Sequence, residues 1–215
     1  TKYRIQILKE KMLSQPRYVS IEQALIITKT YKQHENEPII LKRAYALANA
    51  LRELEIGIEN EELIVGNRTK GVRYGVVFPE SGISWVDREF ETISTRKQDK
   101  FLVRDEDIKI FREQIVPYWK GKSLEDVIKQ NFGKEISAIN KVVKINQTDH
   151  AQGHICPNVE KWLQKGVSGL LEDAQNHYKN ADEDKKNFYQ AIIIVMKAVQ
   201  NFMLRYHDLL IATAK

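Results

Sequence analysis

The chain has 215 residues, of which 42% are hydrophobic and 29% are charged. This balance is typical of a globular protein with a sizeable core and argues against intrinsic disorder. The most apolar run, residues 191–195, is far too short to cross a bilayer, and no signal-peptide core follows the basic first residues. The single cysteine excludes an internal disulfide framework. We therefore expect a cytoplasmic protein without a membrane partner.

The net charge of +5 raises the question of a nucleic-acid partner, because clustered lysine and arginine neutralise phosphates. Here the basic residues are interleaved with acidic ones, as in Lys9-Glu10-Lys11 and in residues 182–186. That pattern is typical of solvated helix faces rather than of a basic arm. We expect no nucleic-acid partner.

Helical spacing dominates the first quarter of the chain. Ser20-Ile21-Glu22-Gln23 fits a capping box, in which the serine side chain accepts from the amide three residues later and the glutamine reaches back. A second helix is predicted from Pro38, at a first-turn position, to Leu54. Its predicted core face consists of Leu41, Tyr45, Ala48, Leu51 and Leu54.

The periodicity changes after Gly57. Leu63-Ile64-Val65 and Val76-Val77-Phe78 are short apolar runs bounded by glycine, asparagine or proline. Such runs are typical of brief strands or of extended loop segments, and the sequence does not separate the two.

Helical spacing returns in the centre of the chain, first around residues 85–93 and then from Asp105 to Trp119. Pro117 is expected to tighten or kink the end of the second of these helices. Ser123 is expected to cap a further short helix.

The carboxy-terminal helix is the clearest prediction, running from Asp182 or Glu183 to Ala214 with one long apolar stripe. Ile192 to Met196 would present apolar groups on more than one side of that helix. We therefore expect other polypeptide to cover it, either in this fold or in a longer protein.

One ordered run of residues is specific enough to indicate a family. It comprises Glu61 to Thr69, then Phe78-Pro79-Glu80, Trp85, Arg96, Asp99 and Phe101. This order resembles the "ELIVGN … PE … R … D … F" pattern of the pyruvate formate-lyase-like domain of glycyl radical enzymes. Structural roles are expected for the polar members of this run, including ion pairs around Glu80.

Four further blocks are similar to the same family and extend the resemblance over nearly the whole chain. They are Pro38 to Leu54 ("P…RA.AL…L"), Gly153 to Leu163 with Gly166 ("GH…PD..KVL..G"), Phe188 to Ala191 ("FY.A") and Arg205-Tyr206 ("RYA"). The resemblance implies a mainly α fold with a few short strands, namely the outer helices and the opening portion of an α/β barrel. Residues 1–215 would then be a partial pyruvate formate-lyase-like domain.

The family's chemistry requires a cysteine loop and a glycyl radical loop, and neither motif occurs in these residues. No catalytic residue is therefore predicted in this segment. Cys156 lies in the histidine block and is interpreted as a packing or pocket-wall cysteine. The chain alone is expected to be an inactive fragment.

For the intact enzyme, the resemblance implies cleavage of a C–C, C–O, C–N or C–S bond of a small organic substrate by a thiyl radical. The chain itself would bind no cofactor. Its partners would be the rest of the enzyme chain, a second copy in a homodimer, and an S-adenosylmethionine iron–sulfur activating enzyme that installs the glycyl radical under anaerobic conditions. The alternative is a non-catalytic helical interaction module derived from that family.

The resemblance places substrate-binding residues in the histidine block. His154 is the first candidate, followed by His150 and Asn146, each four residues earlier. The alternatives are a histidine that caps the helix beginning at Pro157, or three solvent-facing loop residues. Imidazole donors would favour a hydroxylated or carboxylated substrate over a quaternary amine.

A metal site is not predicted in the same block. His150 and His154 have no glutamate between them as in the metalloprotease helix, and Gly153 and Pro157 disfavour one continuous helix that would hold both imidazoles together.

Overall fold

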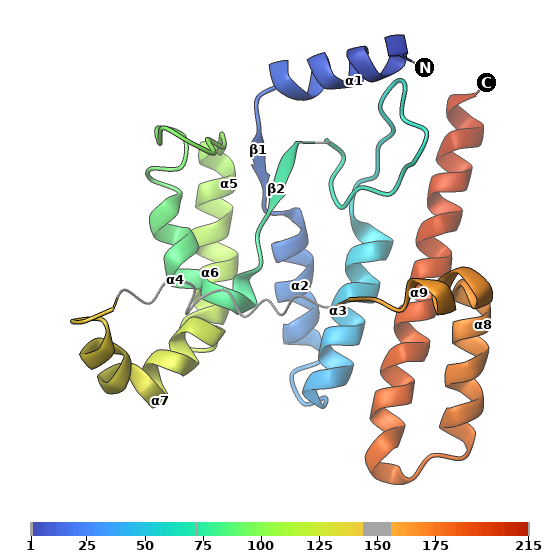
Figure 1. The fold of residues 1–215 in the computed structure, drawn as a ribbon. Helices are drawn as coiled ribbons and strands as arrows, with labels where there is room; N and C mark the ends of the chain where they lie inside the picture. The colour runs from blue at the N-terminus through green and yellow to red at the C-terminus, as the bar shows by residue number, and fades with distance from the viewer. Residues whose placement is uncertain (1, 72, 144–155, 215) are drawn as a thin grey trace. The chain divides into compact units, whose positions relative to one another are not determined.

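The computed structural model of the chain describes residues 2–71, 73–143 and 156–214 (Figure 1). The chain is mainly helical with a single short sheet among these residues, and the predicted fold class is confirmed. The helices are α1 (Lys2–Ser14), α2 (Glu22–Gln33), α3 (Ile39–Glu53), α4 (Pro79–Glu89), α5 (Asp105–Ile110), the π-helical turn η1 (Phe111–Ile115), α6 (Val116–Trp119), α7 (Leu124–Ile139), α8 (Val159–Lys179) and α9 (Glu183–Thr213). The strands are β1 (Tyr18–Ser20) and β2 (Tyr74–Val76).

Two compact units divide the chain. The helical unit comprises Thr1–Ser14, Lys29–Val72 and Cys156–Lys215. The mixed unit comprises Gln15–Thr28 and Arg73–Ile155. Each unit is described by itself below.

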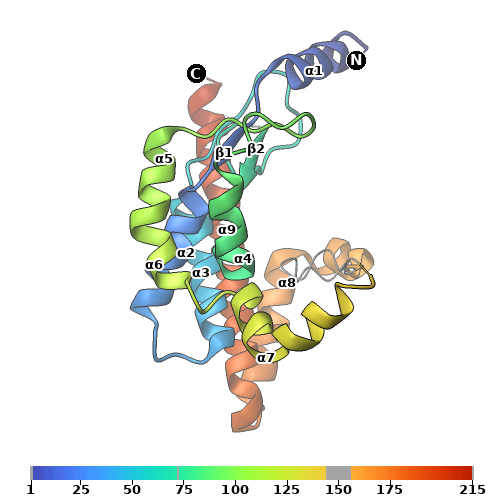
Figure 2. The ribbon, with the colours of Figure 1, turned by 90° about the vertical axis from the view of Figure 1, so that its left-hand side faces the viewer.

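In the helical unit, α9 is the central element and packs along both α3 and α8. Figures 1 and 2 show α8 and α9 as an antiparallel hairpin. Leu41 and Ala44 of α3 meet Ala191 of α9 in a buried cluster. The 3.6-residue periodicity of both segments gives each helix an apolar face, and these two faces pack together. The small alanine side chains let the two helix backbones approach closely.

The core face predicted for α3 is correct in part. Leu41 and Leu54 are buried, while Tyr45, Ala48 and Leu51 are only half-buried. The remaining buried positions of the helix are alanines at 44, 46 and 50.

The segment between α3 and β2 belongs to the helical unit up to residue 71 and is irregular. The Glu62 carboxylate accepts from the backbone N–H of Glu59 at 2.9 Å and from the Asn67 side-chain amide at 3.4 Å. The backbone bends at Leu63 and Ile64, so Leu63-Ile64-Val65 is a loop segment and not a strand, whereas Val76 of the other apolar run belongs to β2.

In the mixed unit, β1 and β2 pair in parallel, with Tyr18 opposite Tyr74 and Ser20 opposite Val76. Figures 1 and 2 both show the two strands side by side. Leu102 forms a parallel bridge to Tyr18. A parallel pair needs a long crossover, and here the chain supplies more than fifty residues between the strands.

The predicted helix from Asp105 to Trp119 is confirmed, but it contains a π-helical turn at η1. Pro117 explains this feature, because proline has no N–H to donate and its ring collides with the carbonyl group four residues earlier. Widening the turn before the proline relieves that conflict. Phe111 and Ile115, at the two ends of the π turn, are fully buried.

Two capping predictions have different outcomes. Ser123 caps α7 as expected, since its hydroxyl accepts from the backbone N–H of Asp126 at 3.3 Å. The helix that follows has 16 residues and is not short. The Ser20 hydroxyl instead accepts from the backbone N–H of Glu22, two residues later, at 3.4 Å, so the predicted capping box is wrong. Ser20 is the last residue of β1, and its position in the strand places its hydroxyl near the N–H of Glu22 and not near that of Gln23.

The predicted carboxy-terminal helix is confirmed as α9, which starts after Asp182 and ends before Ala214. Four of its residues are buried, but Phe188, Met203, Leu204 and Ile211 are at least half exposed. The apolar stripe is thus only partly covered within this chain. None of the described helices combines the length and the apolar character that crossing a membrane would require.

Candidate functional site

The three residues predicted to contact substrate lie in the segment 144–155. His154, His150 and Asn146 are therefore outside the described residues and remain predictions. Cys156, just after this segment, is exposed, which does not fit a packing role among the described residues, while its interpretation as a pocket-wall cysteine stays a prediction. The α8 cap belongs to Asn158, whose side-chain oxygen accepts from the backbone N–H of Lys161 at 3.0 Å.

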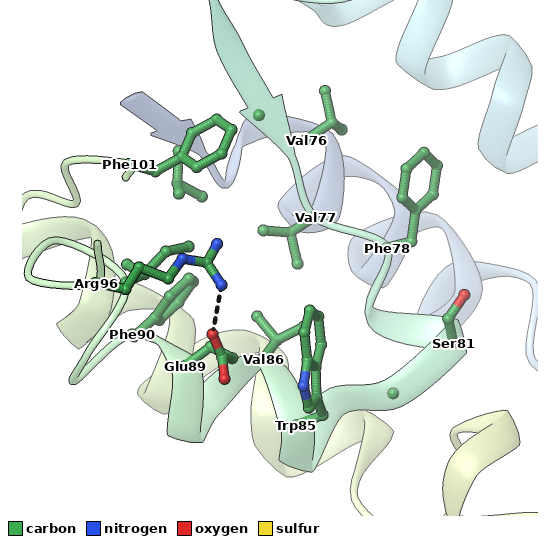
Figure 3. Close-up of a pocket in the computed structure, with 14 residues that line it drawn as sticks. Val76, Val77, Phe78, Ser81, Trp85, Val86, Glu89, Phe90, Arg96 and Phe101 are labelled. Atoms are coloured by element: carbon green, nitrogen blue, oxygen red, sulfur yellow. Dashed lines mark hydrogen bonds and ion pairs between the residues drawn. The ribbon is translucent and has the colours of Figure 1, made fainter. Parts of the chain in front are cut away.

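The described residues form a pocket of about 300 Å³ in the mixed unit, which we call the α4 pocket (Figure 3). It lies between β2, α4 and the loop 91–101. Its lining consists of Val19, Gly75, Val76, Val77, Phe78, Ser81, Gly82, Trp85, Val86, Glu89, Phe90, Ile93, Arg96 and Phe101.

Helix α4 supplies one wall of the α4 pocket. Phe78 precedes the helix and Pro79 opens it, where a missing N–H costs no hydrogen bond. After a kink at Gly82, residues Trp85, Val86, Glu89 and Phe90 repeat at the i, i+4 spacing of one helix face. The local sequence therefore turns two aromatic rings and one carboxylate toward the same space, as Figure 3 shows.

The loop 91–101 supplies the opposite wall and holds the one basic residue of the lining. Arg96 Nη1 donates to Glu89 Oε2 at 2.9 Å, and Arg96 Nε donates to the carbonyl oxygen of Asp99 at 3.1 Å. Asp99 has a φ of 51°, a left-handed conformation that aspartate tolerates better than most residues. Arg96 and Glu89 thus form an ion pair that the sequence did not assign, and the ion pairs expected around Glu80 stay a prediction.

Phe101 closes the loop by packing on the strand. A Cβ atom at Gly75 would lie 2.9 Å from Phe101 Cε1, so only glycine lets the ring lie against β2. The guanidinium of Arg17 stacks 4.5 Å from the centroid of the Phe101 ring and also pairs with Asp99 at 3.1 Å. These contacts hold the loop 91–101 in place as a wall of the α4 pocket.

The α4 pocket suits noncovalent binding rather than catalysis. Its polar side chains are Ser81, Glu89 and Arg96, and the last two neutralise each other. The rest of the lining is apolar, which favours an apolar guest. The sequence pattern had marked Phe78, Trp85 and Phe101 together, but their ordered spacing indicated a family and not a cavity.

The mainly helical fold, the parallel strand pair and the sequence order of the residues around α4 together indicate a protein family. The family model described as "Pyruvate formate lyase-like" matches residues 1–215, and the chain belongs to this family. The resemblance inferred from the sequence is confirmed.

Particular relatives include dehydratases. The chain is 27% identical to the (2S)-3-sulfopropanediol dehydratase of Klebsiella oxytoca over 96% of its own length and 26% of that protein. Among solved structures, the glycerol-bound form of the B12-independent glycerol dehydratase from Clostridium butyricum has a TM-score of 0.89 and 30% identity, with 96% of this chain and 27% of that one covered. A glycyl radical enzyme from Archaeoglobus fulgidus has a TM-score of 0.87 and 30% identity, covering 99% and 28%.

The chain spans about a quarter of the length of the relatives that it matches.

Proposed function

We propose that the chain is the amino-terminal segment of a glycyl radical lyase or dehydratase and is inactive by itself. The observation that supports this proposal is the likeness to the glycerol dehydratase structure over 96% of this chain but only 27% of that one. A chain that matches a larger enzyme over almost its whole length, but covers only a quarter of that enzyme, is expected to be a partial domain.

In the intact enzyme, a thiyl radical would cleave a C–C, C–O, C–N or C–S bond of a small organic molecule. The glycyl radical would be installed by an S-adenosylmethionine iron–sulfur activating enzyme and passed to a cysteine, and both radical residues would come from polypeptide beyond this segment. A stored radical of this kind is lost to oxygen, so we propose an anaerobic cytoplasm as its location. The enzyme would be a homodimer.

The part of this chain in the reaction would be to position substrate. We propose His154, followed by His150 and Asn146, as side chains that hydrogen-bond a hydroxyl or carboxylate group. Imidazole can donate to oxygen in either protonation state, and an amide offers both a donor and an acceptor. Placing the substrate within reach of a radical is an orientation effect, which can supply a large share of a rate enhancement.

The proposal is tested on the protein as its source produces it. An antibody against residues 183–215 is expected to detect a species about four times the length of this chain, given the share of its relatives that the chain spans. After anaerobic activation, that species should show the electron paramagnetic resonance signal of a glycyl radical. The 215-residue chain under the same treatment serves as the control and should show none.

If the source produces only a 25.1 kDa protein and no complementary chain, the enzyme proposal is overturned. It would support the alternative, a non-catalytic helical interaction module. Substitution of His154 by alanine in the larger species should raise the KM for substrate while leaving the amplitude of the radical signal unchanged. Unchanged substrate kinetics would reject its binding role.

A further inference from the structure

We propose that the α4 pocket binds a neutral, flat aromatic molecule of one or two rings that carries one N–H or O–H donor, such as indole or a phenol. Its lining includes none of the substrate residues proposed above, and binding there does not depend on the radical chemistry. Its failure would leave the proposed function untouched.

The volume sets the size of the ligand. An apolar cavity of about 150 Å³ accommodates benzene, and binding pockets for small molecules begin at about 300 Å³. The α4 pocket has about 300 Å³, which suits one or two fused rings but excludes a nucleotide or a long chain.

The aromatic lining sets the shape of the ligand. Phe78 and Trp85 come from the start and the body of α4, and Phe101 comes from the facing loop (Figure 3). Phe90 is held rigidly, since it is 5% exposed and packs edge-on against Phe111 with the ring centroids 4.7 Å apart. Trp85 is 37% exposed, so a ligand can reach the rings from solvent. Rings favour other rings in offset or edge-to-face contacts.

The ion pair sets the charge of the ligand. Arg96 and Glu89 cancel each other, so the wall attracts neither an anion nor a cation strongly. A ligand carboxylate would be repelled by Glu89 and attracted by Arg96, and a ligand ammonium group would meet the reverse, so neither charge gains a strong net attraction. A neutral molecule avoids the cost of moving a charge out of water into an apolar lining.

The same pair explains the need for a donor. Glu89 uses Oε2 to accept from Arg96, and within the described part of the chain its Oε1 accepts no hydrogen bond. A carboxylate oxygen is a strong acceptor and has no donor to offer. An N–H or O–H on the edge of the ligand ring can therefore hydrogen-bond with Glu89 Oε1 while the ring lies among the aromatic side chains.

Isothermal titration of the 215-residue chain with indole tests the proposal. Benzofuran is the matched control ligand, because it has the shape of indole without the donor. Indole is expected to bind saturably, and about tenfold more tightly than benzofuran, since a hydrogen bond to a charged group contributes about 1.5–3 kcal/mol. Indole-3-acetate, which is anionic, is expected to bind more weakly than indole.

Two variants locate the binding in the α4 pocket. Val86→Phe fills the cavity and should abolish indole binding, whereas Glu89→Gln, which keeps an oxygen acceptor but loses the charge, should weaken it by about fivefold and reduce the preference over benzofuran. Glu91→Gln is the matched control, because Glu91 is two residues further on, lies outside the lining and pairs with Arg112. It should bind indole like the unaltered chain.

Three results would overturn the proposal. They are the absence of saturable indole binding at millimolar concentration, equal affinity for indole and benzofuran, or stronger binding of indole-3-acetate than of indole. The ligand comparison uses the unaltered chain, so a folding defect in Val86→Phe cannot obscure the outcome.

Discussion

Arg205 ties the end of one helix to the middle of another. Its two terminal nitrogens donate to the carbonyl oxygens of Leu51 and Leu54, each at 2.6 Å, where α3 ends. The last carbonyl groups of a helix have no partner within it, and a guanidinium fork can satisfy two of them together. The residue therefore caps α3 from α9.

Replacement of this arginine should be costly. Arg205→Ala is expected to lower the free energy of unfolding by about 2 kcal/mol, because it removes two charge-assisted hydrogen bonds. Arg205→Lys should recover only part of that loss, since an ammonium group lacks the fork. Urea denaturation followed by circular dichroism measures the change. Lys197→Ala, an exposed cation on the same helix, should stay within about 0.5 kcal/mol of the unaltered chain.

The neighbouring Tyr206 makes the helical unit sensitive to alkaline pH. Its hydroxyl donates to the carbonyl oxygen of Asn67 at 3.2 Å, and the residue is 4% exposed. Burial raises the pKa of Tyr206, and the nearby negative charge of Glu62 adds to that effect. The folded state therefore favours the neutral phenol.

The sign of the pH dependence follows from this shift. Since the pKa of Tyr206 is higher in the folded chain, its contribution is complete below the ordinary pKa of about 10 and is lost as the pH rises through the folded value. Unfolding free energies measured between pH 8 and 11.5 should fall more steeply in the unaltered chain than in Tyr206→Phe. Equal slopes for the two proteins would show that Tyr206 does not titrate on unfolding.

At the scale of the element, α8 contains one position whose backbone conformation strongly favours glycine. Gly166 has φ of 60° and ψ of −177°, which interrupts the helix between Val159 and Lys179. This conformation is almost exclusive to glycine and costs other residues about 1–3 kcal/mol. A Cβ atom at this position would have no heavy atom of the described chain within 4 Å, so the cost arises from the backbone alone.

Glycine-to-alanine substitutions in two helices should consequently change the stability of the chain in opposite directions. Gly166→Ala is expected to destabilise the chain by about 1–2 kcal/mol. Gly133→Ala, inside the regular helix α7 and also without a close neighbour, should stabilise it by about 0.5–1 kcal/mol. Thermal unfolding of both variants makes the comparison. A stabilising Gly166→Ala would mean that the interruption of α8 is not imposed by the fold.

At the scale of the whole molecule, α7 leaves several large apolar side chains exposed. Val127, Phe132 and Ile139 are 41%, 58% and 49% exposed, whereas Glu125 in the first turn is 4% exposed. Leu124, Ile128, Phe132 and Ile136 share one helix face, on which Phe132 is exposed and the other three residues are half-buried. These incompletely covered apolar side chains agree with the proposal that further polypeptide belongs to the protein.

That proposal predicts that substitution of Phe132 affects the 215-residue chain and the longer protein differently. Phe132→Ser should change the stability of the 215-residue chain by less than about 0.5 kcal/mol, because the ring is exposed there. In the longer protein the same change should cost about 3 kcal/mol or more. Phe111→Ala, at a position with 0% exposure, is the positive control and should destabilise both proteins. Similar small effects of Phe132→Ser in both would contradict the proposed covering.

The sequence alone predicted several elements because their signals are local. Periodicity over 31 residues marked α9, proline and leucine bounded α3, and Ser123 marked the start of α7. The family was also readable, since it depends on the order of residues along the chain. Local spacing fails at Ser20 because the strand that precedes α2 changes which N–H its hydroxyl meets.

Only the tertiary structure decided which distant residues meet. The sequence predicted a structural role for Arg96, but its pairing with Glu89 depends on how the loop 91–101 folds back on α4. The α4 pocket arises in the same way, from contacts between strand, helix and loop that no single periodicity encodes. Helix spacing and family order are properties of neighbouring residues, whereas a cavity and its charge pairing are properties of the packed chain, and for that physical reason the first could be read from the sequence and the second could not.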